Sequence, residues 1–140
     1  MAGELVVGYD GSECAIVALD EAVRIAKKFE TSVVVIFSAH VPSALSGGAG
    51  DQRRVIEAKG EEFLQEARGR IEAAGVGCIT RIVDDRPAEA LVATAAEFDA
   101  EMIVVGTYSD RPMTAALVGS TPPKLLHLSE HPVLVVPVSQ

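Results

Sequence analysis

The chain has 140 residues, 49% hydrophobic and 23% charged, which is typical of one folded globular domain over residues 1–140 and excludes a disordered chain. Only 4% of residues are aromatic, so Val, Ile, Leu and Ala must build the core. The formal net charge of −8, with no compensating basic patch, argues against nucleic acid or an anionic membrane surface as a partner.

The start of the chain predicts a buried strand, a turn and a helix. Residues 4–9 form a short apolar, β-branched run that ends at the turn-forming sequence Asp10-Gly11-Ser12. Small and apolar residues then recur every three or four positions through residues 13–29, with charged residues between them. This spacing predicts an amphipathic helix with Ser12 as its N-cap.

The second strand and the second helix are separated by a loop. Residues 32–38 are apolar almost throughout, as in a strand covered on both faces. Residues 40–50 collect Pro, Ser and Gly, which is typical of a surface loop. Residues 51–74 resume a helical pattern that ends at a C′ glycine, Gly75, although Gly60 weakens the prediction for the first half of this helix.

A third strand, helix and fourth strand follow in the same alternation. Residues 76–83 predict a strand, and Pro87 suits the first turn of the next helix. The apolar face of that helix reaches Phe98, and residues 102–105 predict the fourth strand.

Prolines define the last helix and strand. The pair at 122–123 fits only a first helical turn, so the helix should begin at about Ser120 or Thr121, and we expect it to end near His131. Residues 132–138 predict a fifth strand, and Pro137 places it at an edge because proline donates no ladder hydrogen bond.

This order of elements predicts the fold class. Alternating strands and helices give a single doubly wound α/β sheet, mostly or wholly parallel. Ligands of such sheets bind beyond the carboxyl ends of the strands, where the winding direction reverses. Asp10 and Gly106 both follow predicted strands, and they face one site if the first and fourth strands are neighbours.

Residues 104–121 are the strongest candidate for a binding loop. Gly106 ends a strand and Gly119-Ser120 introduces a helix, an arrangement that lets backbone N–H groups approach a phosphate. The loop exceeds the usual βα length of about 2–6 residues and contains Arg111, a candidate phosphate partner. The alternative interpretation is two turn glycines, an N-cap serine and a solvent-facing arginine.

The spacing of the two cysteines and the lack of a long apolar run indicate the cellular compartment of the protein. Cys14 and Cys78 lie far apart without the spacing of metal ligands, so we expect reduced thiols, no disulfide framework and no metal site. We also expect no signal peptide and no membrane span, and hence a cytoplasmic protein.

The whole chain resembles the universal stress proteins through the segments VVGYDGSECA, RPAEALVATAAEFDAEMIVVG and GSTPPKLLHLSEHPVLVVP. The resemblance implies a flavodoxin-like, five-stranded parallel sheet of order 3-2-1-4-5. Family members that bind ATP carry Gly, two residues, Gly, nine residues, then Gly followed by Ser or Thr. Here Gly106, Ser109 and Gly119-Ser120 keep that spacing, with Ser109 in place of the second glycine.

The resemblance also implies a ligand, an adenine nucleotide: ATP, or AMP or cyclic AMP, with Mg²⁺ as a candidate companion. Asp10 would accept from a ribose hydroxyl or the base, and Ser120 and Thr121 would face phosphate. The prolines after Thr121 remove two N–H donors, which would weaken the grip on a polyphosphate. Some relatives that resemble this chain in having a proline here bind cyclic AMP, so a monophosphate is a candidate ligand. The nucleotide-binding residues are expected to be Gly8, Tyr9, Asp10, Ser38, Ala39, Gly106, Thr107, Ser109, Arg111, Gly119, Ser120 and Thr121.

A homodimer is the expected assembly. The resemblance implies pairing through the edge strand, and an apolar edge would otherwise invite uncontrolled pairing. The interface residues are expected to be Val133, Leu134, Val135, Val136, Pro137 and Val138.

Three functions remain open. The first is a regulatory stress-response protein that binds a nucleotide; no catalytic residue stands out, so any ATP hydrolysis would be slow. The second is a receiver-type phosphoacceptor built on Asp10, Asp84 and Asp85, although the lysine expected after the last strand is absent. The third is a dimerisation module that binds no nucleotide.

Overall fold

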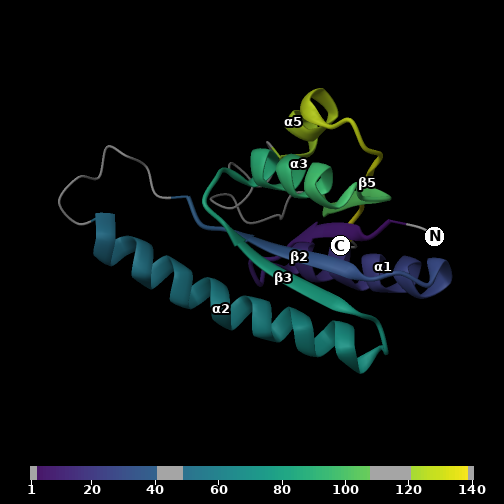
Figure 1. Cartoon of the computed structure of the whole chain (residues 1–140), viewed down its shortest axis with the longest axis horizontal. Coiled ribbons are helices and arrows are strands. Elements are labelled where there is room, and N and C mark those ends of the chain that lie inside the picture. The colour runs from purple at the N-terminus through teal and green to yellow at the C-terminus, as the bar shows by residue number, and fades with distance from the viewer. Residues whose placement is uncertain (1–2, 41–48, 108–120, 139–140) are drawn as a thin grey trace.

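The computed structural model describes residues 3–40, 49–107 and 121–138, in which strands and helices alternate along the chain (Figure 1). The elements are β1 (Leu5–Gly8), α1 (Glu13–Phe29), β2 (Val33–Ser38), α2 (Ala49–Ala73), β3 (Cys78–Val83), α3 (Pro87–Phe98), β4 (Met102–Gly106), α5 (Thr121–Leu128) and β5 (Val133–Val136). All nine correspond to elements expected from the sequence.

The five strands form one parallel sheet in the order β3-β2-β1-β4-β5, which confirms the predicted fold class and order. Helices cover both faces. The core on one face packs α1 and α2 against Leu5 and Val7 of β1. The core on the other face packs α3 and α5 against Val6. Since successive strand residues point to opposite faces, the unbroken apolar run of β1 is what a central strand requires.

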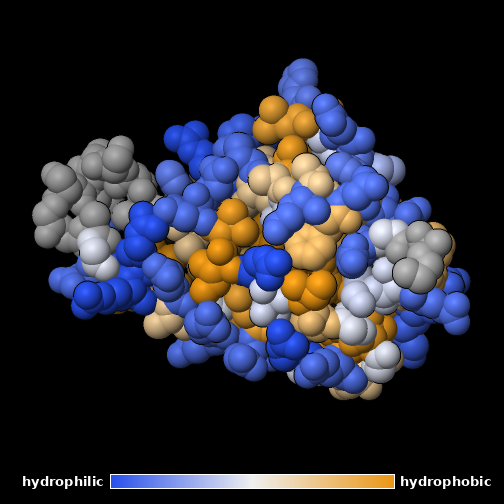
Figure 2. Space-filling view, viewed as in Figure 1, coloured by the Kyte–Doolittle hydropathy of each residue, from blue (hydrophilic) through white to orange (hydrophobic). Residues whose placement is uncertain are grey.

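The two edge strands are only half-buried, because each has a neighbour on one side alone. Figure 2 shows apolar side chains gathered between β3 and α3 on this side of the molecule, with charged side chains around them. Ile79 and Val83 of β3 belong to this half-buried set. The Arg81 guanidinium lies 5.3 Å from the centre of the Phe98 ring and shields part of it from water.

Helix ends follow local chemistry. Ser12 caps α1 as predicted: its Oγ accepts a hydrogen bond from the Ala15 N–H at 3.3 Å. After α2, Gly75 adopts a positive φ of 78°, and the Val76 N–H donates to the Ile71 carbonyl at 3.3 Å. This closing pattern is the one expected of a C′ glycine.

Several boundaries differ from those expected. α2 begins at Ala49, two residues early, and the rest of the predicted loop lies largely outside the described residues. α5 ends at Leu128 rather than near His131, because Ser129 closes a turn in which its Oγ accepts from the His131 N–H at 3.0 Å. β5 stops at Val136, and beyond it the Val138 N–H donates to the side chain of Thr107 rather than to a backbone carbonyl.

Candidate functional site

The candidate site lies at the carboxyl ends of β1 and β4. These strands are direct neighbours, with Val7 paired to Val104, and β2 flanks β1 on its other side. The chain therefore winds outward from β1 in one direction and then crosses to β4 in the other. This is the switch point at which open α/β sheets bind ligands, and it brings the turn after β1 beside the exit from β4.

The turn after β1 presents Asp10 to solvent. Its side chain is exposed, and its Oδ1 accepts a hydrogen bond from the Ser12 N–H at 3.0 Å. This is an Asx-turn, the ordinary structural role of an aspartate before a helix. A carboxylate can accept further hydrogen bonds, so the turn orients Asp10 and still allows it to accept from a ligand hydroxyl.

Tyr9 does not face this site. Its side chain is 2% exposed and belongs to the core beneath α1 and α2, together with Leu5 and Val7. Its hydroxyl donates to the Glu66 carboxylate of α2. Gly8 points to the opposite face, where a Cβ would lie in ordinary contact, 3.7 Å from Leu91. The Tyr9 side chain is thus engaged in packing.

The exit from β4 touches the first turn of α1. A Cβ on Gly106 would overlap the carbonyl oxygen of Cys14 and would lie 3.0 Å from the Cys14 carbonyl carbon. Glycine is therefore required here for close packing within the protein, whatever it does for a ligand.

Thr107 joins the exit from β4 to the edge of the sheet. Its N–H donates to the Val136 carbonyl at 3.0 Å, and its Oγ1 accepts from the Val138 N–H at 3.0 Å. The Thr107 side chain thus extends the pairing of the two strands beyond the end of β5. Sequence reasoning missed this role because nothing in the local pattern links residue 107 to residue 138.

Ser38 and Ala39 follow β2 at the same edge of the sheet. The Ser38 hydroxyl donates to the Asp85 carbonyl, and the Ala39 N–H donates to the Val83 carbonyl at 2.8 Å. Ser38 thus connects the end of β2 to the loop after β3, and Ala39 connects it to the last residue of β3. Asp84, in the loop after β3, pairs with Arg53 of α2 at 2.6 Å. This hydrogen bond raises the pKa of Arg53.

The sheet order bears on the receiver alternative. That class of domain has the order 2-1-3-4-5, which makes the first and third strands neighbours. Here β2 lies between β1 and β3, so Asp10 is separated by a strand from Asp84 and Asp85. Asp85 Oδ1 also accepts from the Arg86 N–H at 2.8 Å. The acidic cluster that the receiver interpretation needs is not assembled by this order of strands.

The centre of the predicted phosphate loop lies outside the described residues. This applies to Ser109, Arg111, Gly119 and Ser120. Thr121, which is described, is the first residue of α5 and is partly exposed. In the same first turn, Lys124 lies 3.1 Å from Glu89 of α3, so the ion pair ties the beginnings of the two helices together.

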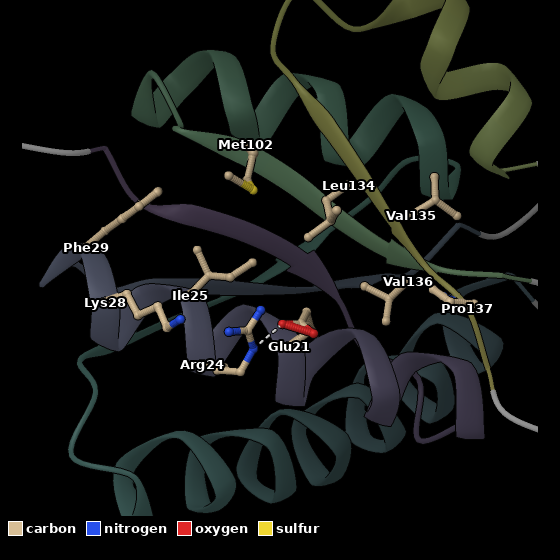
Figure 3. A pocket seen from close by; sticks show the side chains of 10 residues that line it. All are labelled: Glu21, Arg24, Ile25, Lys28, Phe29, Met102, Leu134, Val135, Val136 and Pro137. Carbon is tan, nitrogen blue, oxygen red and sulfur yellow. Dashed lines mark hydrogen bonds and ion pairs between the residues drawn. The ribbon is translucent and has the colours of Figure 1, made fainter.

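The predicted interface residues lie on β5 and just after it. Val133 to Val136 form the strand, and Pro137 and Val138 follow it. Beside this edge is a groove of about 480 Å³ between α1 and β5 (Figure 3). Its floor is apolar and includes Ile25, Met102 and Leu134, while Glu21, Arg24 and Lys28 add charge from α1.

Neither a metal-binding group of side chains nor a membrane-spanning helix is found in the described part of the chain. Within residues 3–40, 49–107 and 121–138, no three His, Cys, Asp or Glu side chains gather into a group that could hold a metal ion. No helix in this part of the chain is long and apolar enough to cross a membrane.

The fold and its switch point define the chain as a doubly wound α/β protein with a five-stranded parallel sheet of order 3-2-1-4-5. A family model, described as the universal stress protein family, matches residues 1–137. Universal stress protein MJ0531 of Methanocaldococcus jannaschii is 28% identical over 137 residues, which cover 95% of this chain and 81% of that protein. The chain belongs to the universal stress protein family.

Two further relatives agree with this membership. Universal stress protein Rv1636 of Mycobacterium tuberculosis is 30% identical over 139 residues, covering 94% of each chain. A crystal structure of a universal stress protein in complex with cAMP has 30% sequence identity and a TM-score of 0.76, and the match covers 98% of each chain.

Proposed function

We propose that this protein binds an adenine nucleotide at the carboxyl ends of β1 and β4 and acts as a regulatory binding protein of the stress response in the cytoplasm. The observation that carries the proposal is the adjacency of β1 and β4, which brings the exposed Asp10 turn beside the exit from β4. The solved relative in complex with cAMP supports an adenine nucleotide as the ligand class.

The parts of the nucleotide are assigned by position. Asp10 accepts from the ribose or the base, and the backbone at Ser38 and Ala39 contacts the adenine. Thr107, Ser109, Arg111, Gly119, Ser120 and Thr121 surround the phosphates, with the spacing of the sequence motif as the reason. ATP, AMP and cyclic AMP are the ligands to compare, with Mg²⁺ as the companion of ATP.

Binding rather than efficient catalysis is the proposed activity. Asp10, the exposed carboxylate at the site, is held in an Asx-turn and is assigned to the nucleoside rather than to the phosphates. The residues assigned to the phosphates are four with hydroxyl groups, one glycine and one arginine, none of which is a general base at neutral pH. Any hydrolysis of ATP is therefore slow.

Isothermal calorimetry with ATP, AMP and cyclic AMP tests the phosphate loop. We expect Gly119→Val to abolish binding, because a branched side chain would fill the space through which the backbone approaches phosphate. Ser109→Gly should strengthen ATP binding if the serine Cβ crowds the phosphates. Gly69→Val is the matched control, since Gly69 lies on α2, where a Cβ would have nothing within 4 Å, and the change should leave affinity unchanged.

Two results would contradict the proposal. If the wild-type protein takes up none of the three nucleotides at millimolar concentration, the chain is a module without a nucleotide. If Gly119→Val binds as tightly as the wild type, the phosphate loop has been misassigned.

The proposal includes a homodimer through β5. Carbonyls of Pro132 and Val136 accept from β4, so alternation along a strand directs the N–H and C=O groups of Val133 and Val135 outward. An outward row of backbone groups is a template for pairing with a second chain. The groove beside it exposes Phe29, which is 45% exposed, and can receive apolar side chains from the second copy.

Sedimentation velocity tests the dimer. We expect the wild type to sediment as a dimer and Phe29→Glu or Pro137→Glu to shift it toward monomer, because each places a charge in the apolar contact. Leu126→Glu is the matched control: Leu126 is 72% exposed on α5, which packs on the face of the sheet opposite to α1 and its groove, so its replacement should leave the dimer intact. A monomeric wild type would contradict this part of the proposal.

A further inference from the structure

One turn of α2 packs against the residues on both sides of Asp10. A Cβ on Gly11 would lie 2.5 Å from Cε1 of Phe63, so the turn rests directly on that ring. Gly11 also has a positive φ of 77°, a conformation that favours glycine. On the other side of Asp10, Tyr9 meets the Phe63 ring edge-on, with centroids 6.5 Å apart and planes at 75°.

A hydrogen bond completes this contact. The Tyr9 hydroxyl donates to the Glu66 carboxylate, three residues after Phe63 on the same helix. Phe63 is held in turn by Phe37 of β2, whose ring centroid lies 6.0 Å away. The turn of α2 from Phe63 to Glu66 is therefore anchored to the sheet and contacts both neighbours of Asp10.

We propose that Phe63 and Glu66 are positioning residues that set the affinity of the nucleotide site by holding the Asp10 turn, without contacting the nucleotide. The inference rests on the proposed function above. A carboxylate that recognises a ribose or base must be held within about 0.5 Å and 10–20° of its binding geometry, and an exposed glycine-containing turn does not supply that rigidity alone. Packing on Phe63 and the Tyr9 bond to Glu66 supply it.

Nuclear magnetic resonance of the ligand-free protein provides the first test. In Phe63→Leu the ring beneath Gly11 is lost, so the amide order parameters of Gly11 and Ser12 should fall from about 0.85 toward 0.6. Phe98→Leu is the matched control, because Phe98 is also a half-buried helical phenylalanine but lies on α3, in the core of the opposite face. It should leave both order parameters unchanged.

Nucleotide affinity, measured by calorimetry, provides the second test. Phe63→Leu and Glu66→Ala should each weaken AMP binding about three- to ten-fold, the range expected when one hydrogen bond to the ligand is lost. In an Asp10→Ala background the same changes should cause no further loss, because they act through Asp10. Glu66→Gln keeps an acceptor for Tyr9 and should restore most of the affinity lost in Glu66→Ala.

The outcomes separate this inference from the proposed function. Unchanged order parameters in Phe63→Leu overturn the positioning role, whatever the protein binds. Losses of affinity that add fully in the Asp10→Ala background also overturn it, since α2 would then act by another route. Lower order parameters in a protein that binds no nucleotide support the positioning of the turn and contradict the proposed function.

Discussion

The phenol of Tyr9 is buried, although the residue directly follows a strand that leads to an exposed turn. Burial raises the pKa of Tyr9 to about 12, and the hydrogen bond and negative charge of Glu66 act in the same direction. A protonated phenol donates to the carboxylate, whereas a phenolate would face a like charge in a site with little water. The fold therefore favours the protonated form.

Tyr9 should make stability depend on pH in the alkaline range. Its pKa is about 12 in the folded protein against 10.0 for an unperturbed tyrosine, so the folded state holds the proton more tightly. The stabilisation is complete below pH 10 and is lost as the pH rises from 10 to 12. A shift of two pKa units corresponds to at most about 2–3 kcal/mol.

Urea unfolding of the wild type and Tyr9→Phe between pH 8.5 and 11.5 measures this effect. The free energy of unfolding of the wild type should fall more steeply with pH than that of Tyr9→Phe, which lacks the titrating group. The comparison cancels the titration of lysines, which both proteins share. Parallel curves would mean that Tyr9 titrates normally in the folded protein.

At the scale of the element, two of the three glycines of α2, Gly60 and Gly69, lie in opposite environments. A Cβ on Gly60 would lie 2.5 Å from Cδ2 of Phe37, whereas one on Gly69 would have nothing within 4 Å. Gly60 is buried and lets the helix approach β2 closely; Gly69 is exposed. The glycine that weakened the helix prediction thus marks a close contact between α2 and the sheet.

Alanine at these two positions should change stability in opposite directions. Gly60→Ala should destabilise the protein by about 1–3 kcal/mol, because the Phe37 ring must move within a packed core. Gly69→Ala should stabilise it by roughly 0.5–1 kcal/mol, since alanine is the better helix former. Guanidinium unfolding of both variants checks the signs, and a stabilising Gly60→Ala would show that α2 is packed less closely on β2 than the structure indicates.

At the scale of the whole molecule, β1 is the central strand of the sheet. It pairs with β2 and β4, contributes buried side chains to both cores and leads to the Asp10 turn. A ligand that binds at this point contacts the part of the sheet on which both layers of helices pack. Binding there should stabilise the folded state as a whole rather than one loop.

Thermal unfolding measures that linkage. At a ligand concentration 100 times the dissociation constant, binding adds about 2.7 kcal/mol, which raises the melting temperature of a chain of this size by roughly 6–12 °C. Gly119→Val should melt at the temperature of the ligand-free wild type whether or not nucleotide is added. A nucleotide-induced rise in Gly119→Val equal to that of the wild type would place the ligand elsewhere.

Sequence patterns predicted most of the fold because local rules control it. Apolar runs identified every strand, Ser12 and Gly75 identified helix ends, and prolines located α5 and the edge position of β5. The direction of Tyr9 was also encoded locally: it is in phase with Leu5 and Val7, and strand alternation sends all three to the same core. For the site, the same patterns identified Asp10 and Gly106 at the ends of their strands.

The amino-acid pattern sufficed to predict the alternation of strands and helices, and the family resemblance added the order of the strands. The contacts between residues far apart in the sequence follow only from the three-dimensional arrangement: Gly106 against the Cys14 carbonyl, Thr107 bonded to the Val138 N–H, and Phe63 beneath Gly11. Periodicity reports whether a residue is buried, but contacts between distant segments depend on how helices and strands are placed in space. That placement is why α2, which supplied no residue to the predicted site, packs against both neighbours of Asp10.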